Sequence, residues 1–545
     1  NPFTSTPREP YLATPRKVHS DTRSCGLINY PSPDLGRGRT VVRGIVRVRL
    51  VRILVIRFFE KMLDGFGLDC YLASAAVAGL LLARRHRSRS RSPAESLLFD
   101  AFDPRSRRSH YTVKHTFCAK GCLPLWVADQ ELALAPSIHA ALRARAMHPT
   151  FGYTIQPDLV WERVARWLAA RHAWQGLTPR DFVFTSNLVS STVNGIRAFT
   201  RAGDAVCVLL PLYHPLQALV VKSGRTLVTQ QLVLSETTGR YEIDFEKLRA
   251  AFNAHSVKLL IWCSPHNPGG RVWTRSELRR VVEICQSNDA YIISDEIHSD
   301  LILPSSSCPH TPLAVVARDD CEGYAAERVM TMSGPGKTWN IAGLHCGFVI
   351  MQSAALRAKY LAVAEHAFLH YGSVFATTAL LAAYSTREEV TAAAAAAAGS
   401  ASASASAELR CNVEGGSGGD PAAWLELLLL HLDRNVDLVV RVVRERMPQL
   451  KVMRPGASYL VWLDCEELQL DGVPPEGEGE GALSALMRFF TEQAKVQPSP
   501  GFLFGGEATS HFIRLNIACP TPYLEEALQR IALAYQELMG ERRRT

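Results

Sequence analysis

The sequence predicts an α/β fold, in which helices cover a mostly parallel β-sheet. From about Leu97 to the end of the chain, hydrophobic runs with strand character alternate with amphipathic helical patterns, and this alternation is typical of such a fold. The length of 545 residues and the hydrophobic content of 47% allow one large core or two. We therefore expect a globular α/β enzyme with additional segments at its surface.

Six hydrophobic runs are the candidate strands, and each has the length of a strand in a buried sheet. They are Phe182–Thr185, Ala205–Leu210, Lys258–Trp262, Tyr291–Ser294, Val329–Met332 and Gly347–Ile350. Polar and charged motifs come directly after several of them. Because ligands of open α/β sheets bind outside the carboxyl ends of the strands, we expect the functional side chains at that edge.

The net charge of +8 resides in the N-terminal part of the chain. Residues 1–95 contain 17 Lys and Arg against 7 Asp and Glu, whereas the remaining 450 residues contain 43 and 45. A body near neutrality lacks the electrostatic footprint of a nucleic-acid-binding protein. We therefore expect no nucleic-acid partner, and we assign residues 1–96 to a basic, poorly ordered extension.

The extension contains one hydrophobic segment, residues 68–83, followed by an alternating Arg/Ser run. Between Asp69 and Arg84 lie 14 uncharged residues, and a bilayer-spanning helix needs about 17–25. A removable targeting peptide or a short anchor fits this length better. The sequence begins at Asn1 and its first methionine is Met62, so we expect a fragment or a reading frame extended upstream. These features predict a cytoplasmic or organellar enzyme, bound to a membrane only if residues 68–83 are retained as an anchor.

Thirteen cysteines are scattered without CxxC pairs or the regular spacing of a disulfide framework. Such usage in a long chain fits a reducing compartment. Cys118 and Cys122 lie four residues apart, but no second pair with zinc spacing follows. We therefore expect no metal site.

Residues 391–420 combine an alanine run, Ser-Ala repeats and a Gly/Ser cluster. This composition indicates a low-complexity surface insertion. A fold tolerates such an insertion because closure entropy grows slowly with loop length.

The run Ser-Gly-Pro-Gly-Lys-Thr-Trp-Asn-Ile-Ala-Gly-Leu, residues 333–344, presents Lys337 in an unusual setting. Its Gly-Lys-Thr resembles the end of a phosphate-binding P-loop, but the first glycine of that motif would fall on Thr331, so the motif fails. A second interpretation fits better. A strand ends near Ser333, a tight Gly-Pro-Gly turn follows, and the lysine lies at the tip of that turn.

Other motifs accompany Lys337 in a characteristic order. They are Leu-Pro-Leu-Trp-Val-Ala-Asp at 123–129, Phe-Gly-Tyr at 151–153, Pro-Leu-Tyr-His-Pro at 211–215, Cys-Ser-Pro-His-Asn-Pro-Gly-Gly-Arg-Val-Trp at 263–273, Ile-Ile-Ser-Asp-Glu-Ile-His-Ser-Asp at 292–300 and Phe-Ile-Arg-Leu-Asn-Ile-Ala-Cys-Pro at 512–520. With them the chain resembles fold-type I pyridoxal 5′-phosphate (PLP) enzymes of the class I/II aminotransferase superfamily, specifically the cystathionine β-lyase or C–S lyase branch. The resemblance covers Leu98 to Glu541 apart from the insertion.

The resemblance implies the fold-type I PLP-dependent transferase fold. Its large domain has a mostly parallel sheet, and its smaller α+β domain is formed by the N-terminal and C-terminal parts. We expect an N-terminal arm and the start of the small domain at 97–150, the PLP-binding large domain at 151–370, and the C-terminal small domain at 371–545, with the insertion at 391–420.

The resemblance also assigns roles around the cofactor. Lys337 holds PLP as a Schiff base and then acts as a general base, and it must be neutral for both tasks. Asp295 faces the pyridine nitrogen, because the electron sink works best when that nitrogen is protonated. Asn267 donates to the phenolic oxygen, Tyr213 stacks on the ring, and His298 lies near the cofactor oxygen or has a packing role.

The phosphate is expected at the N-terminus of a helix beginning near Asn187, Leu188 and Val189, where free N–H groups and the helix dipole favour an anion. Here the chain departs from the family pattern. Asn187 stands where the family has a glycine, and Gly336 stands where a hydroxyl residue commonly precedes the lysine. We therefore expect one phosphate hydrogen bond to be missing and the cofactor to be retained less firmly.

Four further residues are implied to contact the substrate or the partner subunit. Arg514 clamps the substrate α-carboxylate with its guanidinium. Trp126 and Asp129 line the substrate entrance or pack beside it. Tyr153 reaches across a dimer interface towards the neighbouring phosphate, which predicts a homodimer with shared active sites.

Three functions follow from the resemblance. The first is a C–S β-lyase that converts cystathionine or another cysteine S-conjugate to a thiol, pyruvate and ammonia. The second is an aminotransferase of aromatic or sulfur-containing amino acids. The third is a degenerate relative without catalytic activity. The motifs of residues 126–129, 295–298 and 337–344 favour the lyase.

Overall fold

The computed structural model describes residues 98–544, except 368–370, 401–418 and 476–482. The chain divides into two units, 1–90 and 91–545, and the described residues belong to the second. The basic extension, its hydrophobic segment 68–83 and most of the predicted insertion therefore lie outside the described residues.

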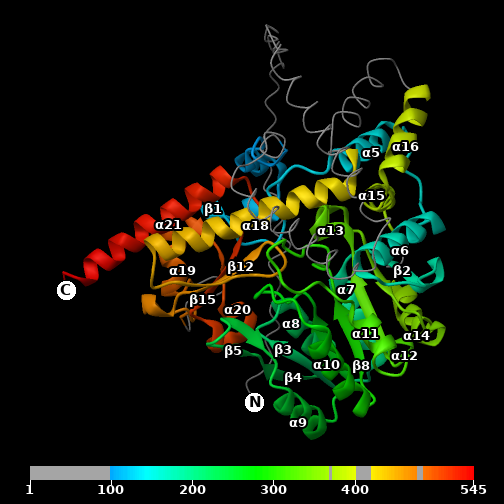
Figure 1. The fold of residues 1–545 in the computed structure, drawn as a ribbon, viewed down its shortest axis with the longest axis horizontal. Helices are drawn as coiled ribbons and strands as arrows, with labels where there is room; N and C mark the ends of the chain where they lie inside the picture. The colour runs from blue at the N-terminus through cyan, green and yellow to red at the C-terminus, as the bar shows by residue number, and fades with distance from the viewer. Residues whose placement is uncertain (1–97, 368–370, 401–418, 476–482, 545) are drawn as a thin grey trace, which may run out of the picture. The chain divides into compact units, whose positions relative to one another are not determined.

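A seven-stranded sheet forms the centre of the second unit (Figure 1). Its strands are β2 (Phe182–Thr185), β3 (Ala205–Leu210), β4 (Thr226–Gln231), β7 (Leu259–Cys263), β8 (Tyr291–Asp295), β9 (Val329–Ser333) and β10 (Gly347–Ile350). They are arranged in the order β2-β10-β9-β8-β7-β3-β4, in which β10 is antiparallel to both neighbours and the other pairs are parallel.

Alternation along the strands explains why helices cover both faces. Successive side chains of a strand point to opposite faces, and in β3 the side chains of Val206 and Val208 belong to one hydrophobic cluster while Cys207 and Leu209 belong to the other. All four side chains are buried. The continuous apolar run is therefore the expected sequence of a strand buried on both sides.

Each face of the sheet has its own set of helices. The first set packs on the Val206 side and comprises α7 (Leu188–Phe199), α8 (His214–Lys222) and α14 (Ala354–Ala364). The second set packs on the Cys207 side and comprises α6 (Asp158–His172), α9 (Phe245–His255), α10 (Arg275–Ser287) and α11 (Leu313–Asp319). α10 begins with a capping box between Thr274 and Glu277, which satisfies N–H groups that the helix leaves free.

A second, antiparallel sheet carries the C-terminal motifs. It has the order β11 (Lys451–Met453), β12 (Leu460–Asp464), β15 (Phe512–Asn516) and β14 (Ser499–Pro500). Two long helices, α18 (Pro421–Arg446) and α21 (Thr521–Arg542), run alongside each other in this part of the molecule (Figure 1). β1 (Leu123–Pro124) pairs with β13 (Val496–Gln497), so the N-terminal arm is joined to the C-terminal part.

The remaining elements are short or connect the two sheets. They are α4 (Val113–Thr116), α5 (Pro136–Met147), β5 (Val233–Ser235), β6 (Arg240–Glu242), α12 (Ala325–Arg328), α13 (Pro335–Thr338), α15 (Val374–Ala383), α16 (Arg387–Ser400), α19 (Ala485–Arg488) and α20 (Phe502–Gly505), with short η turns between them.

A tight turn joins the two sheets at Gly270, whose φ is +63°. The carbonyl of Gly270 accepts hydrogen bonds from the N–H groups of Gly456 and Ala457. A Cβ atom added at this position would lie 2.4 Å from the Cβ of Pro455. Both the conformation and the close approach therefore require glycine here.

The structure confirms the predicted α/β fold and most strand boundaries. Three predicted strands match residue for residue, two end one residue later than predicted, and β7 both begins and ends one residue later. The expectation missed β4, whose mixed pattern Thr-Leu-Val-Thr-Gln-Gln is that of an edge strand with only one fully buried side chain. The predicted insertion begins as regular helix, because α16 continues to Ser400. Within the described part of the chain, no helix is long and apolar enough to cross a membrane.

Candidate active site

Lys337 lies in α13, a single helical turn directly after β9. The expectation of a lysine at the tip of a turn is therefore wrong, because Gly334 is the N-cap and Pro335 begins a short helix. The side chain is half-buried, and its Nζ donates to the carbonyl of Ala128 at 2.6 Å. Burial lowers the pKa of Lys337 to about 8, so the amine loses its proton more readily than an exposed lysine.

Arg514 is a buried cation whose charge acts on Lys337. It lies on β15, is 4% exposed, and donates to the Oδ1 of Asn267 at 3.0 Å and to the carbonyl of Trp126 at 2.9 Å. Its Nε has no hydrogen-bond partner, and no ion pair forms on Arg514 among the described residues. Burial lowers its pKa to about 10. A buried guanidinium without a carboxylate is costly unless a ligand supplies one.

Asp295 ends β8, as expected, and is buried. Its Oδ1 accepts from the N–H of Ile297 at 3.2 Å, and it forms no ion pair within the residues that the structure describes. Burial raises the pKa of Asp295 to about 6. A cation placed against this carboxylate would favour its ionised form.

Asn267 and His298 line the same region. Asn267 is buried and connects Arg514 to the turn after β7. His298 is buried, its Nδ1 is 3.1 Å from the Oγ of Ser458, and its ring centroid is 5.9 Å from that of Tyr459. Burial, followed by the charges of Lys337 and Arg514, lowers the pKa of His298 to about 3, so this imidazole is neutral near pH 7.

Tyr213 is the N-cap residue of α8 and is half-buried. Its phenol lies close enough to raise the pKa of the Arg514 guanidinium in opposition to burial. The aromatic ring expected on the cofactor therefore lies in the same cluster as the arginine.

The predicted phosphate loop is the N-terminus of α7. Asn187 is its N-cap, and the side-chain Oδ1 accepts from the N–H of Ser190 at 2.8 Å. The N–H groups of Leu188 and Val189 belong to the first turn, where a helix has no internal acceptor for them. A Cβ atom added at Gly347 would lie 2.9 Å from the side chain of Leu188 and 3.4 Å from the carbonyl of Ser333 at the end of β9. The start of α7 and the end of β9, which precedes Lys337, are therefore both close to Gly347.

Trp126 and Asp129 belong to the N-terminal arm. The indole N–H of Trp126 donates to the carbonyl of Lys114 at 2.9 Å. Asp129 forms ion pairs with Arg107 at 2.8 Å and Lys114 at 3.3 Å, and its side chain is 22% exposed. Their side chains are therefore partly committed to the arm itself, and their role at the substrate entrance remains a prediction.

Glu131 completes this ion-pair group with Lys114, Arg107 and His115, at 3.0, 2.8 and 3.1 Å. The side chains of Glu131 and Lys114 are fully buried. Burial acts to raise the pKa of Glu131, but the three basic groups outweigh it and lower the pKa to about 2. This group, hereafter the Glu131 network, is internally compensated.

Tyr153 is fully exposed. Phe151 and Ile155, two residues away on either side, are exposed at 55% and 69%. The single chain does not bring Tyr153 into the cluster around Lys337, and its predicted role across a subunit interface stays a prediction.

The sequence did not single out several residues that complete the cluster. Ser499 accepts from Arg514 at 3.2 Å, the Phe504 ring lies 4.8 Å from that guanidinium, and Tyr459 donates to the carbonyl of Ala128 at 3.0 Å. Ser499 could be identified only by its position, because it pairs with Arg514 in the β14–β15 register. That register becomes visible only once the sheet is known.

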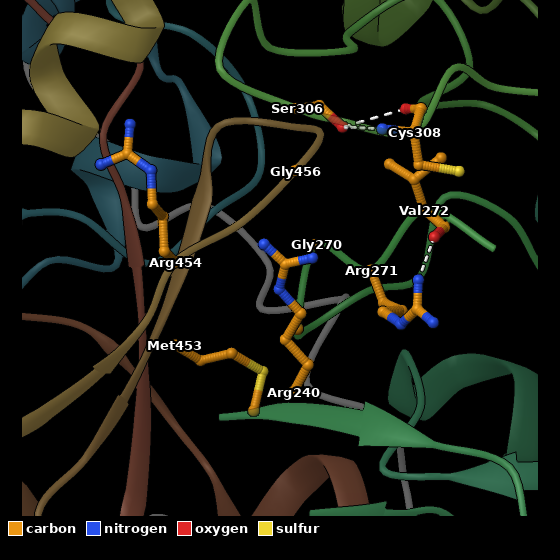
Figure 2. Close-up of a pocket in the computed structure, with 10 residues that line it drawn as sticks. Arg240, Gly270, Arg271, Val272, Ser306, Cys308, Met453, Arg454 and Gly456 are labelled. Carbon is orange, nitrogen blue, oxygen red and sulfur yellow. Dashed lines mark hydrogen bonds between the residues drawn. The ribbon is translucent and has the colours of Figure 1, made fainter. Parts of the chain in front are cut away.

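A separate pocket lies beside the turn that follows Asn267 (Figure 2). Three arginines line it, but Arg271 is 2.6 Å from Glu277 and Arg454 is 2.7 Å from Asp437. In Figure 2 the Arg454 guanidinium points away from Arg271. The arginines therefore do not converge on one ligand, and none of the predicted site residues lines this pocket.

Asp464, Glu466 and His511 could each offer one ligand atom to a metal ion, within 4.8 Å of one another. These side chains are exposed or half-buried at the ends of β12 and β15. His511 lies three residues before Arg514, but among the described residues no hydrogen bond or ion pair joins this group to Lys337, Asp295 or Arg514. The expected absence of a metal stays a prediction.

The clustered residues fit the cofactor that the sequence implies. Asp295 offers a buried carboxylate without a cation, Lys337 offers an amine of lowered pKa, and α7 offers free N–H groups to a phosphate. Arg514 keeps an unpartnered Nε for an anion beside them. These groups could each bind a different part of one ligand. A cluster with only a structural role would not need such a combination of groups.

Comparisons with known proteins agree with this geometry. The model of the family "Aminotransferase class I and II" matches residues 128–531. The chain is 33% identical over 420 residues to cystathionine β-lyase PatB of Bacillus subtilis, covering 77% of this chain and 94% of that protein. It is 28% identical to protein MalY of Escherichia coli, covering 76% and 92%. Among solved structures, cystalysin from Treponema denticola, which contains a pyridoxal 5′-phosphate cofactor, is 25% identical with a TM-score of 0.67, covering 81% of this chain and all of that chain.

Proposed function

The chain belongs to the aminotransferase class I and II family, and from this premise we propose that it is a PLP-dependent C–S β-lyase. Its substrates are amino acids, and its reaction converts cystathionine or another cysteine S-conjugate and water to a thiol, pyruvate and ammonia. The similarity to PatB, which is named a cystathionine β-lyase, supports the reaction. The similarity to cystalysin, whose structure contains pyridoxal 5′-phosphate, supports the cofactor. The observation that carries it is the buried, uncompensated Arg514 in one cluster with Lys337 and Asp295.

The residues of this chain divide the work. Lys337, Asp295, Asn267, Tyr213 and the N-terminus of α7 hold the cofactor. When bound, PLP accepts the electron pair left on the substrate Cα. Arg514 binds the substrate α-carboxylate through charge-assisted hydrogen bonds. Lys337 removes the proton from Cα, and the lowered pKa of its amine favours this step near neutral pH. The Cβ–S bond then breaks as a Cα=Cβ double bond forms, and the electron pair of the broken bond leaves with the sulfur, which takes up a proton. Water hydrolyses the released aminoacrylate to pyruvate and ammonia.

The experiment is a product assay on purified, PLP-loaded enzyme. Cystathionine should yield pyruvate and free thiol in equal amounts without any added keto acid. Amino transfer that depends entirely on a keto acid, with no thiol released, would refute the lyase and establish the aminotransferase. The family includes aminotransferases by name, which makes that activity the second candidate.

A non-catalytic role is the third reading of the sequence. The geometry offers it no support, because Lys337, Asp295 and Arg514 are brought together. A visible absorption band of the bound cofactor that disappears in Lys337→Ala would argue strongly against this role, and release of thiol from cystathionine would exclude it.

The homodimer is part of the proposal. Tyr153 and its exposed apolar neighbours form a surface that a second copy of the chain would cover. If Tyr153 acts across the interface, a homodimer of Tyr153→Phe and a homodimer of Lys337→Ala each lose activity. Refolding a mixture of both variants should restore activity, because hybrid dimers contain one site with both native residues. No restoration, or a monomer in sedimentation equilibrium, would refute the shared site.

For location, we propose a cytoplasmic or organellar enzyme whose N-terminal segment is removed. Fusing residues 1–96 to a fluorescent protein would test this, because an organellar signal relocates the fusion and shortens it.

A further inference from the structure

Gln130 is a buried residue between the two acids of the arm, and none of the motifs above includes it. It is 1% exposed. Its Nε2 donates to the carbonyl of Lys337 at 2.7 Å and to that of Thr338 at 3.2 Å. One side chain from the N-terminal arm therefore holds the backbone of the predicted catalytic lysine.

These two carbonyls need an external donor. The last carbonyls of any helix have no donor within the helix, and α13 has only four residues. Its N-terminal carbonyls are satisfied locally, because Pro335 accepts from Trp339 and Gly336 from Ile341. Buried carbonyls without donors are costly, so Gln130 replaces the turn of helix that would otherwise follow.

The backbone of Gln130 is fixed in turn by Asn340. The N–H of Gln130 donates to Asn340 Oδ1 at 3.0 Å, and Asn340 Nδ2 donates back to the carbonyl of Gln130 at 3.2 Å and to that of Leu132 at 2.9 Å. Asn340 has φ of +56°, a left-handed conformation that asparagine tolerates. The arm and the lysine segment are thus locked in a single register.

The same arm contacts the carboxylate clamp. The carbonyl of Trp126 accepts from Arg514, and Asn516, two residues further along β15, donates to the carbonyls of Val127 and Asp129. The arm therefore spans the distance between Lys337 and Arg514 and is hydrogen-bonded at both ends.

We propose that Gln130 is a positioning residue, which sets the reach of the Lys337 amine towards the Cα of a substrate held by Arg514. This inference rests on the proposed function, in which Lys337 moves the α-proton. A misplacement of about 1 Å costs about 100-fold in rate in a preorganised site, so the backbone anchor has a direct kinetic consequence.

The test variant is Gln130→Met, which keeps the side-chain volume and removes both donors. Its matched control is Asn435→Leu, because the Nδ2 of the buried Asn435 likewise donates to two backbone carbonyls, those of Ile517 and Cys519. Both variants should unfold at lower temperature. In PLP-loaded enzyme, Gln130→Met should lower kcat about 10- to 100-fold and change KM less than about 3-fold. Asn435→Leu should leave kcat within about 3-fold of the wild type.

A spectroscopic readout does not depend on turnover. The visible absorption of the cofactor bound to Lys337 titrates with protonation of the nitrogen that joins them. Four charged groups of the chain act at the position of this nitrogen: Asp129 and Lys114 from the arm, Asp295 from β8 and Arg514 from β15. A loosened α13 admits water and weakens the effect of burial, so the titration midpoint should rise by about 0.5 unit or more in Gln130→Met. It should not move in Asn435→Leu.

The outcomes separate the two proposals. If kcat, KM and the titration midpoint change equally in both variants, Gln130 has only a structural role and the inference is wrong. If the wild-type enzyme releases no thiol from cystathionine but the midpoint still rises in Gln130→Met alone, the positioning role stands and the proposed reaction is wrong.

Discussion

Two of the buried charge centres in the described part of the chain, the Glu131 network and Arg514, differ in how their charges are compensated. In the Glu131 network, two carboxylates are paired with Lys114, Arg107 and His115. Arg514 has no carboxylate and satisfies its N–H groups with neutral oxygens, leaving Nε without a partner. The first centre is complete in the folded chain, whereas the second is complete only with an anionic ligand. Buried charge therefore indicates a binding site here only where the chain itself does not neutralise it.

The largest expected effect comes from breaking the complete centre. Lys114→Met leaves Glu131 and Asp129 without their buried cation, which should lower the free energy of unfolding by about 3–5 kcal/mol. Chemical denaturation of the purified protein measures this change. Lys451→Met is the control, because that lysine is 64% exposed and its ion pair with Glu467 is long, at 3.9 Å. This variant should change the free energy of unfolding by less than about 0.5 kcal/mol. Equal effects of both variants would mean that the Glu131 network is not a stabilising unit.

Arg514→Leu should impair activity and leave stability unchanged or higher, in contrast to Lys114→Met. It removes a buried cation that the chain does not neutralise, so the unfolding temperature should stay the same or rise. It also removes the carboxylate clamp, and kcat/KM for the amino-acid substrate should fall by about 30- to 1,000-fold, or about 2–4 kcal/mol. Arg514→Lys should lie between, because an ammonium keeps the charge and loses the bidentate geometry. A large loss of stability in Arg514→Leu would contradict the comparison.

Acid should weaken the Glu131 network. The folded-state pKa of Glu131 is lowered to about 2 from an ordinary value of 4.5, so its contribution to stability is present above about pH 4.5 and is lost as the pH falls towards 2. Between pH 5.5 and pH 3 the loss should be about 2 kcal/mol more in the wild type than in Glu131→Gln. Urea unfolding at both pH values tests this, and identical pH dependence in the two proteins would contradict it.

The smallest effect concerns the second anion site, at the N-terminus of α7. Asn187 already occupies the N–H of Ser190, so this terminus is partly compensated by its own cap. Asn187→Gly should free that N–H for the phosphate at a cost of a few tenths of a kcal/mol in stability. Equilibrium dialysis of PLP should then show retention that is equal or up to about 3-fold tighter. Weaker retention would mean that the asparagine itself holds the phosphate.

The sequence predicted the fold and the individual residues of the site better than the hydrogen bonds that hold those residues in place. Strand boundaries followed from apolar runs, since burial on both faces demands them, and Asp295 and Lys337 could be placed because each follows such a run. The roles of Ser499 and Gln130 could not be predicted, because they depend on the β14–β15 register and on an arm that returns across more than 200 residues to α13. β4 was missed because an edge strand needs no continuous apolar run.

The glycine turn at Gly270 limits how this enzyme can be altered. Its carbonyl joins two loops from different sheets, and any side chain at that position would meet Pro455. A mutational scan should tolerate only glycine there, and the loop that carries Asn267 then forms a fixed wall of the substrate site. Directed evolution towards cysteine S-conjugates of bulkier thiols should therefore find its beneficial changes among side chains of the arm and α8, where the backbone is not fixed in this way.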